Sequence, residues 1–142
     1  MSSKFSGLAL ATESTARMPI INPMTAQPIR DADGNDAYIE IAYAQCAVGA
    51  AHDRAVIDKR MRIMASGGRY SQEMVDADAN EKLAKLTRGW RLIGLDGQAI
   101  PIDCSEANAR ELYREPTLGW VRDQVVLFSV NLGNFQAAAS TA

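Results

Sequence analysis

Alternation of apolar and polar positions marks two short strands in the first third of the chain. Residues 36–43, DAYIEIAY, alternate between the two classes and are rich in residues that favour β-structure. The shorter stretch 18–22, MPIIN, is followed by a segment dense in turn-forming residues. There, Asp33-Gly34 supplies the positive φ angles that a tight turn needs. We therefore predict a β-hairpin with a long loop between 18–22 and 36–43.

Part of this loop has the spacing of an EF-hand calcium site. With Gly34 at the sixth position of such a site, Asp31 and Asp33 fall at the third and fifth positions and Glu40 at the twelfth. The first position lacks a carboxylate because Ile29 stands there, and the prolines that precede the loop exclude an entering helix. A turn is the better interpretation.

Helical periodicity begins near residue 48. Apolar residues of 48–64 fall on one broad stripe, and Gly67-Gly68 suits the cap that ends this helix. Ser71 can cap a second helix, which acidic residues lead and basic residues close, as the helix dipole prefers. Residues 89–103 then contain two short apolar runs on either side of Asp96-Gly97, the form of a second hairpin.

Two further helices are expected towards the C-terminal end. Ser105 begins the third helix, which Pro116 stops, and Thr117 caps a last and strongly apolar helix over about 118–136. Together these elements predict a small α+β domain, with one or two antiparallel β-hairpins packed against three to four helices. We expect a mobile segment over 1–17 with one short helix around Phe5 to Leu10, a single domain over 18–138 and a flexible tail over 139–142.

The last helix is apolar on two sides. One stripe, about 100° wide, is formed by Leu118, Val121, Val125, Phe128, Leu132 and Phe135. A second apolar group lies on the far side and consists of Trp120, Val126, Leu127 and Val130. Such a helix is either buried completely or has one face for its own domain and one for a partner, and 142 residues leave little room for complete burial. We therefore predict partner binding or self-association through the second group, with Trp120 as its aromatic anchor.

Composition and charge exclude several classes of function. The formal net charge of −2 argues against nucleic-acid binding, which needs a surplus of Lys and Arg on one face. No apolar run is long enough for an export signal or a membrane span, so we expect a cytosolic protein. Cys46 and Cys104 are expected to be reduced, buried thiols, although the sequence leaves a disulfide between them open.

No set of residues in the chain predicts catalysis. His52, next to Asp53, is interpreted as a solvated histidine at the start of a helix, because neither cysteine lies in a recognisable nucleophile context. The few His and Cys residues lack the paired spacing of a metal site, and no phosphate-binding glycine loop is present. We therefore expect no enzyme, no catalytic residues, no metal and no cofactor.

The order of these elements resembles the small tail assembly chaperones of long-tailed bacteriophages. The similarity covers about residues 20–138 and is one of order and pattern. It runs through NPMTAQPIRDADGNDAYIEI, HDRAVIDKRMR, TRGWRLIGLDGQAIPID, SEANARELYRE and GWVRDQVVLFSVNLGNF. Trp90 and the stretch from Trp120 to Val125 carry most of it.

The resemblance implies a non-enzymatic chaperone in the host cell cytoplasm. Such proteins bind the tape-measure protein, keep it soluble before the tail polymerises, and help to recruit tail tube protein. A homo-oligomer is possible, whereas nucleic acid and membrane are not expected as partners. The alternative is a structural virion protein, such as a connector, a tail-end or a minor capsid component, whose apolar helix forms a permanent subunit contact.

Overall fold

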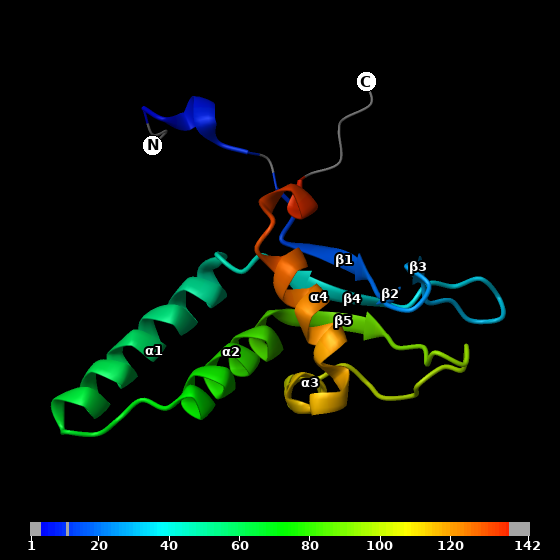
Figure 1. Ribbon diagram of the computed structural model, residues 1–142. Coiled ribbons are helices and arrows are strands. Elements are labelled where there is room, and N and C mark those ends of the chain that lie inside the picture. The colour runs from blue at the N-terminus through cyan, green and yellow to red at the C-terminus, as the bar shows by residue number, and fades with distance from the viewer. Residues whose placement is uncertain (1–3, 11, 137–142) are drawn as a thin grey trace.

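The computed structural model describes residues 4–10 and 12–136, whose centre is a three-stranded antiparallel sheet. Strand β4 (Tyr38–Ala42) lies between β1 (Thr15–Pro19) and β5 (Thr87–Arg91), and helix α4 (Gly119–Ser129) crosses one face of the sheet (Figure 1). The predicted α+β class is confirmed, and so is the pairing of the two N-terminal strand segments. Because β1 begins at Thr15, the expected start of the folded domain at residue 18 falls inside this strand.

The alternation along β4 separates the two faces of the sheet. Ile39 and Ile41 are fully buried and share the apolar core with α4. Tyr38 and Glu40 point to the opposite face, because side chains alternate along a strand, and both are half-buried. In the strand register, Ile39 pairs with Met18 of β1 on one side and with Trp90 of β5 on the other.

The loop between β1 and β4 contains a second small ribbon. Strand β2 (Ile21–Asn22) pairs with β3 (Gln27–Pro28). Further on, the Asp31 carboxylate accepts hydrogen bonds from the backbone N–H groups of Asp33 and Asn35, at 3.0 and 2.9 Å. This carboxylate therefore closes a turn, as the sequence predicted in preference to a calcium loop.

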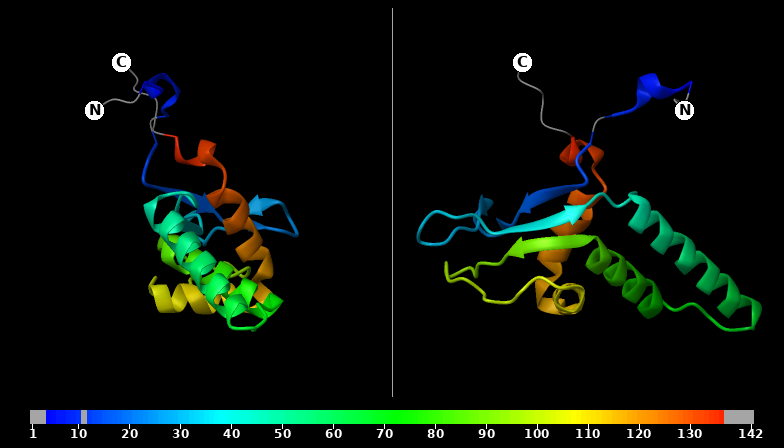
Figure 2. Two further views of the ribbon diagram at one scale, coloured as in Figure 1. Left: turned by 90° about the vertical axis from the view of Figure 1, so that its left-hand side faces the viewer. Right: turned by 180° about the vertical axis from the view of Figure 1, so that it is seen from behind.

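Helices α1 (Ala47–Ala65) and α2 (Gln72–Leu86) form a helical hairpin that leads away from the sheet (Figures 1 and 2). The predicted glycine cap is present, since Gly67 has a φ of +84° and Gly68 donates its N–H to the carbonyl of Ile63 at 2.9 Å. The predicted cap of the second helix is present too, since Ser71 Oγ accepts from the N–H of Met74.

The chain that follows β5 turns back on itself before the third helix. Ile93 and Ala99 form an isolated antiparallel bridge around a turn at Gly97, whose φ is +82°. Helix α3 (Glu106–Arg114) then begins after Ser105, which accepts a hydrogen bond from the N–H of Asn108. Both features agree with the sequence-based prediction.

The last helix begins differently from the prediction. A 3₁₀ turn, η2 (Pro116–Leu118), precedes α4, and Thr117 does not cap it. Instead the Glu115 carboxylate accepts from the N–H of Thr117 at 3.3 Å, and Leu118 occupies the N-cap position of α4 without a side-chain hydrogen bond.

The last helix also ends early, at Ser129 rather than near residue 136. The Asn131 side chain accepts from the N–H of Gly133, and the Asn134 amide donates to the carbonyl of Phe128. These side chains offer the backbone alternatives to helical hydrogen bonds, so the chain continues as the 3₁₀ turn η3 (Leu132–Phe135).

The core lies between the sheet, α3, α4 and the C-terminal half of α2. Phe135 of η3 is fully buried and packs against the rings of Tyr43 and Phe128, with centroids 5.6 and 5.8 Å apart. Tyr113 is also buried, and its hydroxyl is 2.7 Å from the Thr87 hydroxyl. Burial raises the pKa of Tyr113 to about 12.

Where a short helix was expected around Phe5 to Leu10, the structure has the 3₁₀ turn η1 (Ser6–Leu8). It has no buried residue. The expected flexible tail at 139–142 lies outside the described residues.

Candidate interaction surface

Helix α4 has one face in the core and one face in solvent. Val121 and Val125 are buried against the sheet. On the opposite side, Val126, Leu127 and Val130 expose 40%, 71% and 56% of their surface. The helix is therefore not enclosed, and three of the four predicted partner-binding residues form an exposed apolar group at its C-terminal end. We call these three residues the α4 outer face.

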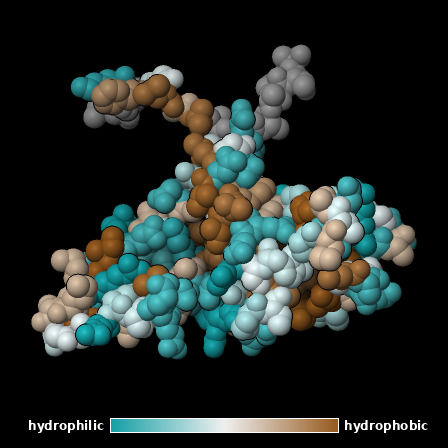
Figure 3. All heavy atoms as spheres, viewed as in Figure 1, coloured by the Kyte–Doolittle hydropathy of each residue, from teal (hydrophilic) through white to brown (hydrophobic). Residues whose placement is uncertain are grey.

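A shallow apolar groove of about 340 Å³ lies beside this face. It is lined mainly by Met18, Pro19, Ile21, Leu127 and Phe128. The groove combines the end of β1 and the start of β2 with α4, so sequence periodicity within a single element could not reveal it. Figure 3 shows apolar side chains gathered over the upper end of α4 and over the loop that follows β5.

Gln124 fixes the wall of the groove. Its Oε1 accepts the N–H of Ile21 at 3.0 Å, and its Nε2 donates to the Ile21 carbonyl at 2.8 Å. One side-chain amide thus satisfies both backbone groups of Ile21, as a neighbouring strand would. Gln124 was not among the predicted site residues, because periodicity along one helix does not indicate a contact with β2.

Trp120 occupies a different position from the other three predicted residues. It is half-buried at the N-terminal end of α4 and packs against the core. Its ring lines an apolar cavity of about 320 Å³ together with Ile29, Leu95 and Leu118, among others. The structure therefore separates Trp120 from the α4 outer face, and a substitution there would affect the core as well as the surface.

The N-terminal segment adds apolar residues that sequence reasoning did not include in the site. Leu8 and Leu10 expose 82% and 65% of their surface. The segment joins the body near η3, where the N–H of Glu13 donates to the carbonyl of Phe135 at 2.6 Å. Its Ser- and Ala-rich composition offered no periodicity by which these leucines could have been assigned to a surface.

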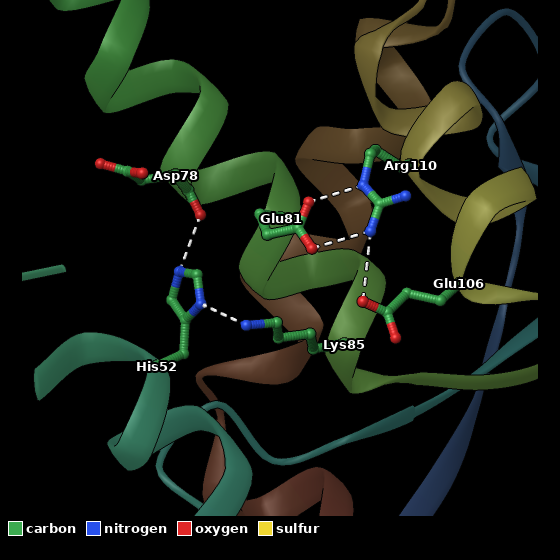
Figure 4. A network of polar contacts seen from close by, with 6 residues as sticks. All are labelled: His52, Asp78, Glu81, Lys85, Glu106 and Arg110. Carbon is green, nitrogen blue, oxygen red and sulfur yellow. Dashed lines mark hydrogen bonds and ion pairs between the residues drawn. The ribbon is translucent and has the colours of Figure 1, made fainter. Parts of the chain in front are cut away.

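A polar network pairs α1 with α2 (Figure 4). His52 is 8% exposed, and its Nε2 lies 3.0 Å from the carbonyl oxygen of Asp78, while its Nδ1 lies 3.4 Å from the Lys85 ammonium. The ammonium can only donate, so Nδ1 accepts and the proton is on Nε2. The prediction of a solvated histidine is wrong, because α2 packs across the start of α1.

Ion pairs extend the same interface outward. Lys82 contacts Asp53 at 2.9 Å, and Lys59 contacts the Asp78 carboxylate at 2.5 Å. The Tyr70 hydroxyl donates to the other oxygen of that carboxylate. These contacts join the two helices of the hairpin by charge and hydrogen bonding.

The apolar stripe predicted on α1 faces mostly outward. Ile57, Met61 and Met64 expose 55%, 65% and 65% of their surface, whereas Val56 and Ile63 are half-buried. Helical periodicity identified the stripe correctly but did not indicate what covers it.

A second ionic contact joins α2 to α3 (Figure 4). The Arg110 guanidinium donates two hydrogen bonds to Glu81, at 2.6 and 2.8 Å, and a third to Glu106 at 3.2 Å. The hydrogen bonds from Arg110 lower the pKa of Glu81. This bidentate geometry fixes the angle between the two helices.

Both cysteines are free, as predicted, but they are half-exposed, so the prediction that they are buried is wrong. Partial burial raises the pKa of Cys104, and the Glu40 carboxylate adds to this effect. Its thiol is therefore protonated at neutral pH and is a weak nucleophile.

His52 uses both ring nitrogens in the contact between α1 and α2.

Within residues 4–10 and 12–136, every helix is too short or too polar to cross a membrane. Within the same ranges, no three His, Cys, Asp or Glu side chains are grouped so that they could hold a metal ion.

The chain was compared with protein-family models, with curated proteins and with solved structures, and none of them matches it.

Proposed function

We propose that this protein is a non-enzymatic tail assembly chaperone of a long-tailed bacteriophage, acting in the host cell cytoplasm. In this role it binds an amphipathic helix of the tape-measure protein through the α4 outer face and assists assembly of the tail tube. The observation that carries the proposal is the exposure of Val126, Leu127 and Val130 beside an apolar groove, on a helix whose other side is anchored in the core.

The physical argument concerns the shape and chemistry of this surface. An amphipathic partner helix binds by placing its apolar side in a groove between apolar residues. The α4 outer face offers such residues at i, i+1 and i+4, and the groove beside Leu127 is framed by Pro19 and Phe128. Since Gln124 holds Ile21 against α4, the groove is formed before the partner arrives.

The test uses a tagged full chain in the phage-producing cell, with mass spectrometry of the captured proteins and of purified particles. The chaperone role predicts capture of a long helical protein, identified as the tape-measure protein, and absence of this chain from the particle. Leu127→Ser should abolish that capture without unfolding the domain. Met24→Ser is a matched control, because Met24 is 87% exposed on the turn between β2 and β3, away from the groove.

Two outcomes would overturn the proposal. Presence of the chain at fixed stoichiometry in the particle would make it a structural virion protein, with the α4 outer face as a permanent subunit contact. Equal loss of capture with Leu127→Ser and Met24→Ser would show that the α4 outer face is not the binding surface. Trp120→Ala is less informative, because Trp120 also packs against the core.

A further inference from the structure

The face of the sheet opposite α4 holds a polar cleft of about 460 Å³. Its floor consists of Arg17, Pro19, Tyr38 and Arg91, and residues 34–36 of the loop before β4 form its rim. Seen from behind, the strands lie in front of α4, and of the helices that the structure describes none crosses this side of the sheet (Figure 2). The cleft is therefore open to solvent.

Two arginines contact the same aromatic ring from neighbouring strands. Tyr38 stands in the central strand β4, with Arg17 on β1 and Arg91 on β5. The guanidinium carbons lie 4.4 and 5.4 Å from the ring centroid, respectively. Because both distances refer to one centroid, the two carbons are within about 10 Å of each other. The ring thus contacts both guanidinium groups on the face of the sheet opposite α4.

Two carboxylates beside the cleft, those of Asp31 and Asp36, already have partners within the protein. The Asp31 carboxylate accepts three hydrogen bonds from its own loop, and Asp36 pairs with Arg30 at 2.6 Å. The hydrogen bond from the Asn35 backbone lowers the pKa of Asp31, and the positive charge of Arg91 adds to this effect, so this carboxylate is ionised and committed to the loop.

The arginines of the floor have spare donors. Arg17 makes only a loose ion pair with Glu40, at 3.8 Å, and within the described part of the chain Arg91 takes part in no ion pair. Each guanidinium presents five N–H donors. A ligand that completes this site must therefore supply acceptors, and a carboxylate can accept two parallel hydrogen bonds from one guanidinium.

We propose that this cleft binds an acidic segment of a partner protein in extended conformation, with carboxylates on alternate residues. In an extended peptide, side chains at i and i+2 point the same way and are about 7 Å apart, which suits two guanidinium groups on either side of a ring. Pro19 and Tyr38 supply apolar contact between them. A peptide is favoured over nucleic acid because the cleft offers only two arginines with spare donors, whereas nucleic-acid binding neutralises many phosphates.

This surface is separate from the α4 outer face. Tyr38 and the core residue Ile39 are adjacent in β4 and point to opposite faces of the sheet. The cleft and the groove beside the α4 outer face share Pro19, and their other lining residues are distinct. Neither proposal depends on the other, since Leu127→Ser leaves the cleft intact and a change in the cleft leaves α4 intact.

The test is an NMR titration of the full-length protein with a synthetic peptide, acetyl-Ser-Glu-Thr-Glu-Ser-amide. The control peptide carries Gln in place of both Glu residues. Backbone signals of Arg17, Tyr38, Arg91 and residues 34–36 are expected to shift with the Glu peptide and to stay unchanged with the Gln peptide.

Matched variants localise the binding. Arg91→Gln should weaken the affinity up to about fivefold, the upper end of the range for an exposed charge pair. Arg88→Gln should leave it unchanged, because Arg88 is exposed on the same strand but does not line the cleft. The spectrum of each variant without peptide reports whether it is folded.

Three results would overturn the proposal. Shifts confined to α4 or to the α1–α2 hairpin would place the peptide elsewhere. Equal affinity of Arg91→Gln and the wild type for the Glu peptide would show that the Arg91 guanidinium does not bind this peptide. Equally tight binding of inorganic phosphate or of a short oligothymidine would show an unselective anion site instead of a peptide site.

Discussion

The sheet-centred body and the α1–α2 hairpin of this protein are held together by different forces. In the body, the largest fully buried side chains include Tyr113, Phe135 and Ile39, and they belong to one continuous apolar core. In the helical hairpin, the helices meet through His52 and two lysine–aspartate pairs. Apolar burial is worth roughly 25 cal/mol per Å², whereas exposed ion pairs contribute little. The body should therefore carry most of the stability, and the helical hairpin should open first.

The largest expected effect is the loss of a core aromatic ring in the body. Phe135→Ala removes a fully buried ring that contacts Tyr43 and Phe128, and should lower the free energy of unfolding by about 3–5 kcal/mol. Urea denaturation followed by circular dichroism measures this change. Leu8→Ala is the control, because this leucine is 82% exposed and its loss should cost less than about 0.5 kcal/mol. A loss below about 1 kcal/mol for Phe135→Ala would mean that η3 is not part of the core.

Alkaline pH should weaken the body through Tyr113. Burial raises the pKa of this phenol from 10.0 to about 12 in the folded protein. Between these two values the unfolded chain loses the phenolic proton while the folded chain keeps it, so stability is full below pH 10 and falls as pH rises towards 12. The loss is about 3 kcal/mol at most.

The Tyr113→Phe variant isolates this effect from the other groups that titrate in the same range. It should lose the hydrogen bond to Thr87 at neutral pH, at a cost of about 1 kcal/mol, and should show a smaller decline in stability between pH 10 and 12 than the wild type. Unfolding curves recorded at several pH values measure both quantities. Identical declines in the two proteins would contradict the burial of this hydroxyl as the cause.

A substitution in the polar network between α1 and α2 should destabilise the helical hairpin alone. His52→Ala leaves the Asp78 carbonyl and the Lys85 ammonium without their partner, and should cost about 1–2 kcal/mol. Hydrogen exchange of backbone amides should become faster in α1, while amides of β4 keep their protection. Arg54→Ala, an exposed change on the same helix, should alter neither. Equal acceleration in α1 and β4 would show that the two regions unfold as one unit.

The sequence predicted those parts of the fold that depend on local chemistry. The caps at Ser71 and Ser105, the glycine cap after α1 and the alternation of β4 are all present, because each depends on residues close together in the chain. The early end of α4 depends on Asn131 and Asn134, whose side chains compete locally with helical hydrogen bonds. Helical periodicity considers only apolar spacing and therefore does not predict where these side chains end the helix.

The candidate site was predictable only in part, for a related reason. The second apolar group on the last helix was visible in the sequence, and three of its four members are exposed together. The groove beside them, the pairing of Gln124 with Ile21 and the burial of His52 all require contacts between residues far apart in the chain. A pattern within one segment indicates that a face is apolar but not whether the core or the solvent covers it. The main stripe of α4 lies in the core, whereas most of the α1 stripe is exposed.

The smallest expected effect is that of a substitution on the outward stripe of α1. Comparing it with a substitution in the core tests whether solvent covers this stripe. Met61 and Ile39 are both apolar residues in regular elements, yet Met61 is 65% exposed and Ile39 is fully buried. Met61→Gln keeps helix propensity and length, so it should change the free energy of unfolding by less than about 0.5 kcal/mol, whereas Ile39→Ala should cost about 2–5 kcal/mol. Thermal and urea unfolding at low protein concentration measure the two variants side by side. A loss above about 1 kcal/mol for Met61→Gln would show that this stripe is covered in solution, and the helical hairpin would then be stabilised by apolar contact as the body is.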